Sequence, residues 1–83
     1  MFYVYILKSK SQRYYYIGYT QDLRQRIKDH NQGKTRSLKS KIPIELVYYE
    51  AYNTKTQARK REYELKNNSY KKREIIERIE SDI

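Results

Sequence analysis

Two short β-strands joined by a polar turn are predicted by residues 2–20, FYVYILKSKSQRYYYIGYT. Residues 2–8 and 14–19 are rich in aromatic and β-branched side chains, which favour strands. The short polar segment between them predicts an antiparallel hairpin. In one register Tyr5 lies opposite Tyr16, so both hydroxyls project from the same face of the sheet. The hairpin therefore presents phenols on one surface.

The rest of the chain predicts one further strand and three helical segments around the hairpin. The element order β-β-α-β-α-α predicts an α/β (α+β) fold, with a small three-stranded, mainly antiparallel sheet flanked by helices. The expected elements are a helix from Thr20 or Gln21 to about Asn31 with Asp22 in its first turn, a basic loop over 34–41, a strand over 44–52, a helix from Thr54 to about Lys66 and a helix over about 70–80.

Length and composition limit the kinds of site that the chain can hold. With 83 residues we expect one domain, a thin core and a shallow surface cleft instead of a deep cavity. The absence of cysteine excludes disulfides, a thiol nucleophile and thiolate zinc sites, and a single histidine excludes a histidine-rich zinc site. No apolar run approaches the roughly 20 residues that cross a bilayer, and no signal peptide is apparent. We expect a soluble, cytoplasmic protein.

The charge balance points to a polyanionic partner. Nineteen Lys and Arg against ten Asp and Glu give a net charge of +9, which suits nucleic acid or an anionic membrane and also aids solubility. Eleven tyrosines, with one Phe and no Trp, favour nucleic acid because phenol rings stack on bases. The loop over 34–41 is the best candidate for phosphate contacts, through Lys34, Arg36, Lys39 and Lys41. The basic clusters at 59–61 and 71–73 are expected to be solvated.

Arg26 and His30 occupy the apolar face of the first predicted helix. With Leu23 and Ile27 they have the i, i+3, i+4, i+7 spacing of one helical face. Arg26 has two interpretations: its head reaches water while its stem lies along the core, or its guanidinium holds a phosphate or stabilises developing negative charge. His30 either positions a water or contacts phosphate, or it is a helix-end histidine favoured by the helix dipole.

Glu62 and the two strand tyrosines are the remaining candidates. Glu62 is predicted to face the sheet, where it forms a salt bridge with Arg26 or Arg61 or binds a hard divalent cation such as Mg²⁺. Tyr5 and Tyr16 are either core aromatics or general bases. A free phenol has a pKa of about 10, so a tyrosine base requires nearby cations or a metal-bound water to favour its phenolate.

Taken together, these residues resemble the GIY-YIG nuclease superfamily, and most closely its small stand-alone bacterial branch, whose members are mostly uncharacterised. The resemblance covers residues 2–79 and includes the Pro43-x-Glu45-Leu46-Val47-Tyr48 strand. Each short motif is weak evidence for the family by itself, but all of the motifs together, in this order and at these spacings, are strong evidence. They are Tyr3-Val4-Tyr5, Tyr16-Ile17-Gly18, Arg26, His30-Asn31-x-Gly33 and Glu62.

The resemblance implies a metal-dependent endonuclease domain over residues 1–83. It assigns one divalent ion, Mg²⁺ or Mn²⁺, to Glu62, water activation to Tyr5 or Tyr16, and transition-state stabilisation to Arg26. It also implies DNA in preference to RNA as substrate, a place in DNA repair or recombination, and a protein partner that supplies specificity.

Two departures from the family pattern accompany the resemblance. Tyr3 replaces a glycine, and Tyr19 stands where several active relatives have Lys. Tyr19 and His30 are expected to line the cleft, with Tyr19 contacting nucleic acid. The alternatives are a nucleic-acid-binding module with little catalysis and a protein-interaction adaptor.

Overall fold

The structure is a computed structural model that describes residues 1–81. Its seven elements follow the predicted order, with one additional short helix. None of the helices within residues 1–81 has the length and apolar character that a bilayer crossing requires. The elements are β1 (Phe2–Ser9), β2 (Tyr15–Thr20), α1 (Leu23–Asn31), the 3₁₀ helix η1 (Arg36–Lys41), β3 (Ile44–Tyr52), α2 (Lys55–Asn67) and α3 (Ser69–Ser81).

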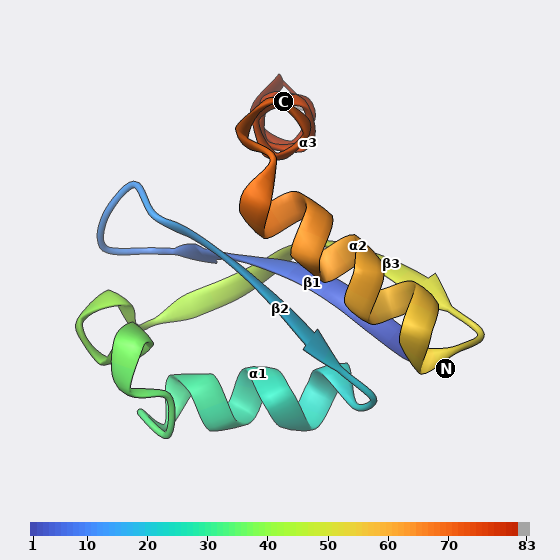
Figure 1. The fold of residues 1–83 in the computed structure, drawn as a ribbon. Helices are drawn as coiled ribbons and strands as arrows, with labels where there is room; N and C mark the ends of the chain where they lie inside the picture. The colour runs from blue at the N-terminus through green and yellow to red at the C-terminus, as the bar shows by residue number, and fades with distance from the viewer. Residues whose placement is uncertain (82–83) are drawn as a thin grey trace.

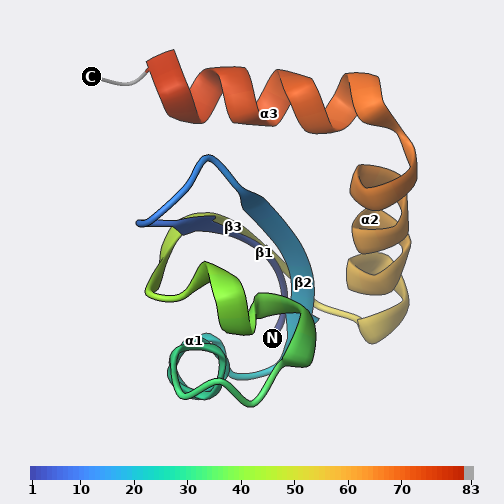
Figure 2. The same cartoon turned by 90° about the vertical axis from the view of Figure 1, so that its left-hand side faces the viewer.

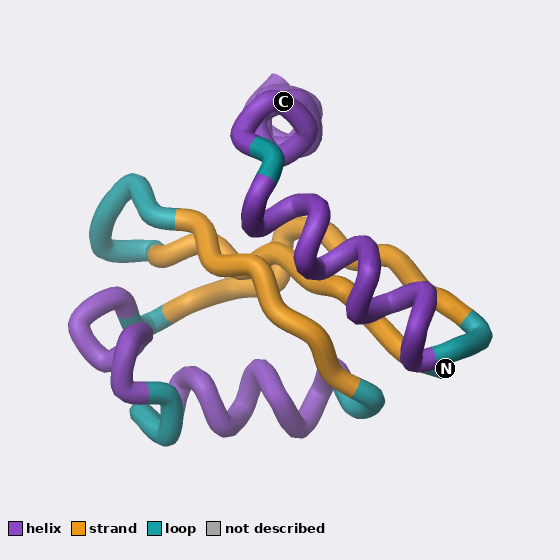
Figure 3. Tube along the Cα trace, in the orientation of Figure 1, coloured by secondary structure: helices purple, strands orange, loops and turns teal. Residues whose placement is uncertain are grey.

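The three strands form one antiparallel sheet in the order β2-β1-β3. Helix α1 and η1 lie on one side of this sheet, and α2 and α3 lie on the other (Figure 1). The view along α1 shows α3 running above the β1–β2 hairpin (Figure 2), and Figure 3 shows how short the connecting loops are. The predicted α+β class and element order are confirmed. Strand β2 is an edge strand, so side chains from both helical layers can meet around it.

The predicted pairing of Tyr5 with Tyr16 is wrong by two residues. Tyr5 pairs with Gly18, and Leu7 pairs with Tyr16. The Ser9 amide donates to the Tyr14 carbonyl at 3.0 Å, and this hydrogen bond places the turn over residues 10–13, one residue later than the predicted pairing requires. A shift of two residues leaves every side chain on its own face. The two tyrosines therefore still share a face, as diagonal neighbours with ring centroids 6.4 Å apart.

Two apolar clusters, one on each face of the sheet, hold the layers together. The α2 side buries Val4, Ile6, Ile17, Ala58, Leu65 and Ile75. The α1 side buries Tyr5, Leu7, Leu38 and Ile44. Strict alternation along β3 would put Tyr48 with Ile44, but an irregularity in the β1–β3 register at Ile6/Leu7 turns Tyr48 to the α2 side.

Helix α1 begins later than predicted, and the basic loop is partly helical. Asp22 is the N-cap of α1 and accepts a hydrogen bond from the Gln25 amide at 3.1 Å, so the helix starts at Leu23 instead of Thr20 or Gln21. Residues 36–41 form η1 because Leu38 is fully buried against the sheet and anchors the segment. Thr54 caps α2 through the Gln57 amide, as its capping-box spacing predicts.

A half-buried carboxylate fixes α2 on the sheet. Glu50 of β3 accepts hydrogen bonds from the hydroxyls of Tyr48 and Tyr52, each at 2.6 Å, and from Arg61 of α2 at 2.9 and 3.1 Å. Burial raises the pKa of Glu50, but these donors outweigh it and hold the pKa below its usual value. Arg61 is therefore a structural residue, and it sets the rotation of the helix that carries Glu62.

Candidate functional site

The first feature of the site is the close contact between Tyr5 and Gly18. A Cβ atom built on Gly18 would lie 2.3 Å from both Cζ and Oη of Tyr5. The Tyr5 ring therefore lies against the bare backbone of the edge strand, with its hydroxyl end over Gly18. Tyr5 is only 1% exposed. The glycine of the second motif is needed for this close approach and not for an unusual φ angle.

Three side chains form a hydrogen-bonded chain behind this contact. Tyr5 Oη lies 2.9 Å from His30 Nε2, and Thr35 Oγ1 lies 2.7 Å from His30 Nδ1. Burial raises the pKa of Tyr5 to about 12; the Arg26 guanidinium opposes this rise, while Tyr16 and Glu62 add to it. Tyr5 is thus protonated at neutral pH, and each ring nitrogen of His30 shares a hydrogen bond with a hydroxyl, Nε2 with Tyr5 and Nδ1 with Thr35.

The groups that shift the pKa of Tyr5 show which predicted site residues lie near it. The pKa of Tyr5 responds to Arg26 from α1, Tyr16 from β2 and Glu62 from α2. Tyr16 is partly exposed and packs edge-on against His30, with ring centroids 5.3 Å apart. The other four predicted catalytic residues therefore either contact Tyr5 or lie near enough to shift its pKa. Of the two tyrosines Tyr16 is the more exposed.

His30 is fully buried, and both of its ring nitrogens have protein partners. Burial lowers its pKa, and the nearby Arg26 charge lowers it further, against a smaller opposing effect of Asp29. The imidazole is therefore neutral at pH 7. In this structure His30 lies behind Tyr5 and supports it, and it does not reach the surface of the cleft.

The depressed pKa of His30 predicts a loss of stability in mild acid. Below about pH 6.5 the unfolded chain takes up a proton that the folded protein resists, so the free energy of unfolding falls as the pH falls. We expect a slope of up to about 1.4 kcal/mol per pH unit. Urea unfolding at about pH 7.5 and about pH 5.5 measures it, in a window where histidine is the main titrating side chain. The His30→Gln variant should lose this slope, and an unchanged slope would contradict the assignment.

Arg26 lies in a shallow hollow beside the start of α1. Residues 1–81 contain no carboxylate within salt-bridge distance of its guanidinium. The hollow has a volume of about 520 Å³ and is lined by Tyr19, Thr20, Gln21, Asp22, Arg26 and Lys55. A half-buried cation without an acidic partner, next to a second cation, suits an anionic ligand.

Glu62 faces an adjoining hollow on α2 and does not pair with Arg26 or Arg61. One carboxylate oxygen lies 3.1 Å from Lys66 Nζ and the other lies 3.8 Å from Arg59 Nε. Its side chain is only 14% exposed. Arg59 also sits over the Tyr19 ring, with Cζ 5.1 Å from the centroid. The pairs that Glu62 makes with Arg59 and Lys66 could be detected in the sequence, because they have i, i+3 and i, i+4 spacing. The basic cluster over 59–61 was instead expected to be solvated.

The predicted phosphate-contact segment lies away from this cluster. Residues 34–41 follow the C-terminal end of α1, whereas the Arg26 hollow opens beside its N-terminal end (Figure 1). Lys34 is paired with Asp29 at 3.3 Å, and Lys41 lies over the Tyr14 ring and donates to Gln12. Arg36 and Lys39 are exposed. These cations flank the site and do not line it.

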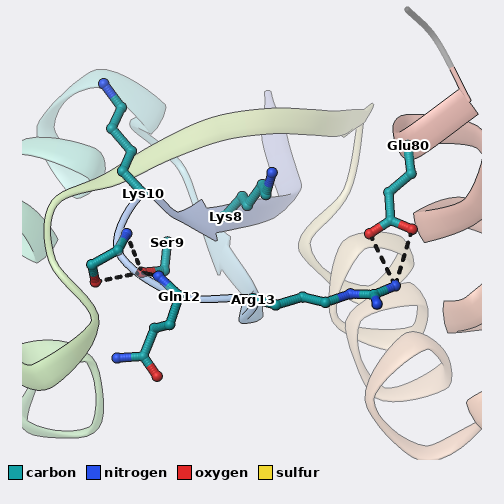
Figure 4. A pocket seen from close by; sticks show the side chains of 7 residues that line it. Lys8, Ser9, Lys10, Gln12, Arg13 and Glu80 are labelled. Carbon is teal, nitrogen blue, oxygen red and sulfur yellow. Dashed lines mark hydrogen bonds and ion pairs between the residues drawn. The ribbon is translucent and has the colours of Figure 1, made fainter.

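A third hollow lies at the β1–β2 turn, and its lining includes Lys8, Lys10, Arg13 and Glu80 (Figure 4). Glu80 of α3 pairs with Arg13 at 3.3 Å and accepts a hydrogen bond from Tyr15 at 2.8 Å. The hollow thus joins α3 to the hairpin, and its function is structural.

Asn31 is a positioning residue that the sequence marked only as part of the His30-Asn31-x-Gly33 motif, without a role. Its side-chain amide donates to the Ile44 carbonyl at 3.1 Å and accepts from the Ile44 amide at 2.8 Å. It acts as a one-residue strand partner for the start of β3, which fixes the end of α1 directly after His30. Gly33, two residues later, has φ of 78°, a conformation that favours glycine.

The donor set around Glu62 restricts which metal ion the site can hold. Within residues 1–81, no three His, Cys, Asp or Glu side chains gather to form a ready-made metal cage. One carboxylate in an open hollow suits Mg²⁺ or Mn²⁺, which complete their shells with water and substrate oxygens. It does not suit zinc, which needs three or four nitrogen or sulfur ligands.

Comparison with known proteins agrees with this arrangement. Residues 1–74 match the model of the GIY-YIG catalytic domain. The chain is 43% identical over 72 residues to the UPF0213 protein SSP2268 of Staphylococcus saprophyticus, covering 86% of this chain and 87% of that one. It is 40% identical over 72 residues to the UPF0213 protein YazA of Bacillus subtilis, covering 86% and 72%.

A solved structure extends the likeness to the fold. The solution NMR structure of the UPF0213 protein BH0048 from Bacillus halodurans is 40% identical, with a TM-score of 0.55, and the match covers 92% of this chain and 82% of that one. The GIY-YIG catalytic domain is a nuclease-type domain that generally uses a divalent metal ion. The chain therefore belongs to the GIY-YIG family and, within it, to the small bacterial branch of UPF0213 proteins.

Proposed function

We propose that the protein is an endonuclease that hydrolyses phosphodiester bonds in DNA with the help of one Mg²⁺ or Mn²⁺ ion. The observation that carries the proposal is Arg26, a half-buried guanidinium without an acidic partner in residues 1–81, held beside the hydroxyl of Tyr5. That environment binds the non-bridging oxygens of a phosphate. The net charge of +9 supports a polyanionic substrate.

Each residue of the site has a separate role in the proposed reaction. Glu62 would hold the divalent ion, which supplies Lewis-acid polarisation of the phosphate and a more acidic water when bound. Arg26 stabilises the negative charge that grows on the phosphate oxygens. Tyr5 stays protonated and its hydroxyl is engaged with His30 Nε2, so Tyr16, the more exposed of the two tyrosines, orients the attacking water.

The proposed enzyme uses residues 1–83 as one domain and acts in the cytoplasm, in DNA repair or recombination, on DNA instead of RNA. Its site is a pair of shallow hollows without deep walls. Because such a surface offers few contacts to bases, a partner protein would supply specificity. Tyr19, at the rim shared with Arg26, is positioned to contact the substrate.

Incubation of supercoiled and nicked plasmid with the protein tests the proposal directly. Cleavage is expected with Mg²⁺ or Mn²⁺ and not with EDTA. Salt-sensitive binding without cleavage would instead favour a nucleic-acid-binding module. If no nucleic acid binds in a salt-sensitive way, a protein-interaction adaptor is the better reading, and the nuclease proposal fails.

Removal of the Arg26 guanidinium should slow cleavage much more than it weakens DNA binding. We expect the rate for Arg26→Ala to fall by about 10²- to 10³-fold, the effect of losing one donor to transition-state charge. Arg24→Ala is the matched control, since Arg24 is an exposed arginine on the same helix. Single-turnover cleavage at saturating protein separates the chemical step from binding. Equal rates for the two variants would remove Arg26 from the mechanism.

A further inference from the structure

Three charged side chains of α2 meet in one hollow. Arg59, Glu62 and Lys66 are spaced i, i+3, i+7 along the helix and lie on one side of it. With Tyr63 and Asn67 they line a hollow of about 310 Å³. Each oxygen of the Glu62 carboxylate faces a different cation, at 3.8 Å for Arg59 and 3.1 Å for Lys66. The carboxylate that would hold a metal ion is therefore already neutralised by two protein cations.

The three side chains differ in how much of each is exposed to solvent. Glu62 is 14% exposed, whereas Arg59 is 59% and Lys66 is 46% exposed. The carboxylate is fixed close to the helix, and both cations reach it from solvent. Ion pairs with exposed partners are weak, at about 0–1 kcal/mol. An anion that arrives from solvent can thus take both cations away from Glu62 at little cost.

Tyr19 gives Arg59 a second support that does not depend on Glu62. The Arg59 guanidinium lies over the Tyr19 ring at 5.1 Å, and the Tyr19 ring is itself stacked on Phe2, with centroids 6.4 Å apart and an interplanar angle of 9°. A guanidinium that rests on an aromatic face keeps its N–H edge available for hydrogen bonds. Tyr19 also lines the Arg26 hollow, so Arg59 stands between the two hollows.

We propose that Arg59 and Lys66 form a phosphate-binding subsite for nucleic acid, and that a phosphodiester bound there frees Glu62 for a divalent ion. In the free protein the two cations compete with the ion for the carboxylate. When a backbone phosphate takes both cations, the carboxylate oxygens lose their ion-pair partners and become available to the ion. The inference rests on the proposed function in taking Glu62 as the metal ligand and nucleic acid as the partner.

The subsite makes metal binding and nucleic-acid binding depend on each other. By linkage, DNA must raise the affinity for the ion by the same factor as the ion raises the affinity for DNA. Substrate oxygens that complete the ion's shell also produce such coupling, so coupling alone does not identify the subsite. What distinguishes it is the sign of the variant effect: removing Arg59 and Lys66 should strengthen metal binding in the free protein while weakening DNA binding.

The test measures Mn²⁺ binding by electron paramagnetic resonance of the free ion, without any cleavage step. We expect Arg59→Gln/Lys66→Gln, in the absence of DNA, to bind Mn²⁺ about 5- to 50-fold more tightly than wild type, within the usual range of coupling between sites. Its affinity for a short DNA duplex in EDTA should fall about tenfold or more, with a smaller salt slope. Lys60→Gln/Arg73→Gln is the control, since it removes one Lys and one Arg that are exposed and lowers the net charge equally.

The possible results distinguish a failure of the subsite proposal from a failure of the nuclease proposal. Tighter Mn²⁺ binding and weaker DNA binding in the double variant alone support the subsite even if no cleavage is ever seen. Unchanged Mn²⁺ affinity, or the same change in the control variant, overturns it. If inorganic phosphate promotes Mn²⁺ binding as strongly as DNA does, the subsite is not one for nucleic acid. If Glu62→Gln binds Mn²⁺ as wild type does, the metal ligand is misassigned and the inference falls with it.

A single substitution checks the role of the Tyr19 ring. Arg59→Lys keeps the charge but loses the planar group that stacks on Tyr19. We expect DNA affinity intermediate between wild type and Arg59→Gln, with Mn²⁺ affinity close to wild type. If Arg59→Lys behaves as wild type in both assays, the Tyr19 platform contributes nothing to the subsite.

Discussion

Replacing Glu62 by glutamine is expected to reduce metal-dependent cleavage by about 10³-fold or more. Glutamine keeps the size of the side chain but removes the charge that holds a hard divalent ion. The loss is large because residues 1–81 contain no cluster of three or more His, Cys, Asp or Glu side chains that could hold the ion instead. Plasmid cleavage and Mn²⁺ binding, measured on the same preparations, give the two readouts.

The design of this experiment separates a lost ligand from a lost fold. Glu62 pairs only with exposed cations, so its neutral replacement should leave thermal unfolding nearly unchanged. DNA affinity in EDTA should hold or rise, because Arg59 and Lys66 are released. Glu74→Gln, the same chemical change at an exposed site of α3, should behave as wild type. Cleavage by Glu62→Gln at the wild-type rate would show that Glu62 is not the metal ligand.

Adding one methyl group at Gly18 is expected to destabilise the protein by about 1–3 kcal/mol, the usual effect of overpacking. The new Cβ would lie 2.3 Å from the end of the Tyr5 ring. That ring cannot move aside easily, because Tyr5 is 1% exposed and its hydroxyl is bonded to His30. Urea unfolding measures the loss, and cleavage should fall with it, because the displaced hydroxyl belongs to the site.

A double-mutant cycle attributes this effect to the contact between Tyr5 and Gly18. In a Tyr5→Leu background the ring is gone, so Gly18→Ala should cost clearly less than it does in wild type. Gly33→Ala is a comparison with a different cause. Space is available there, with the nearest atom 3.6 Å away, but φ of 78° disfavours alanine. If the two Gly18 costs are equal, the clash with Tyr5 is not the reason that the position needs glycine.

The fold was largely predictable because its signals are local. Tyrosine and β-branched runs mark the strands, and the caps at Asp22 and Thr54 lie within three residues of the amides that they bond. One error arose where a distant contact decides: residues 36–41 coil because Leu38 is buried in the core. The other, the hairpin register, depends on a local detail, the hydrogen bond between Ser9 and Tyr14 that closes the turn.

The sequence could indicate candidate residues for the site, but it could not indicate how their side chains are arranged. Arg26 and Glu62 were singled out because a polar residue on an apolar helix face needs a reason. Which partner each one meets depends on helix rotation, and that rotation is set by Glu50 and Arg61 through long-range hydrogen bonds. The bond from Thr35 to His30 likewise appears only once the segment after α1 has folded back.

The chain from Thr35 through His30 to Tyr5 also offers a way to observe the site spectroscopically. His30 is the only histidine, so its imidazole resonances in an NMR spectrum identify themselves without assignment. Both of its ring nitrogens are buried and hydrogen-bonded, one to Tyr5 and the other to Thr35, which slows exchange of the ring proton with solvent and keeps the signal visible. Phosphate or a metal ion entering beside Tyr5 would change the field at that ring. One resonance can therefore report occupancy of the site during a titration.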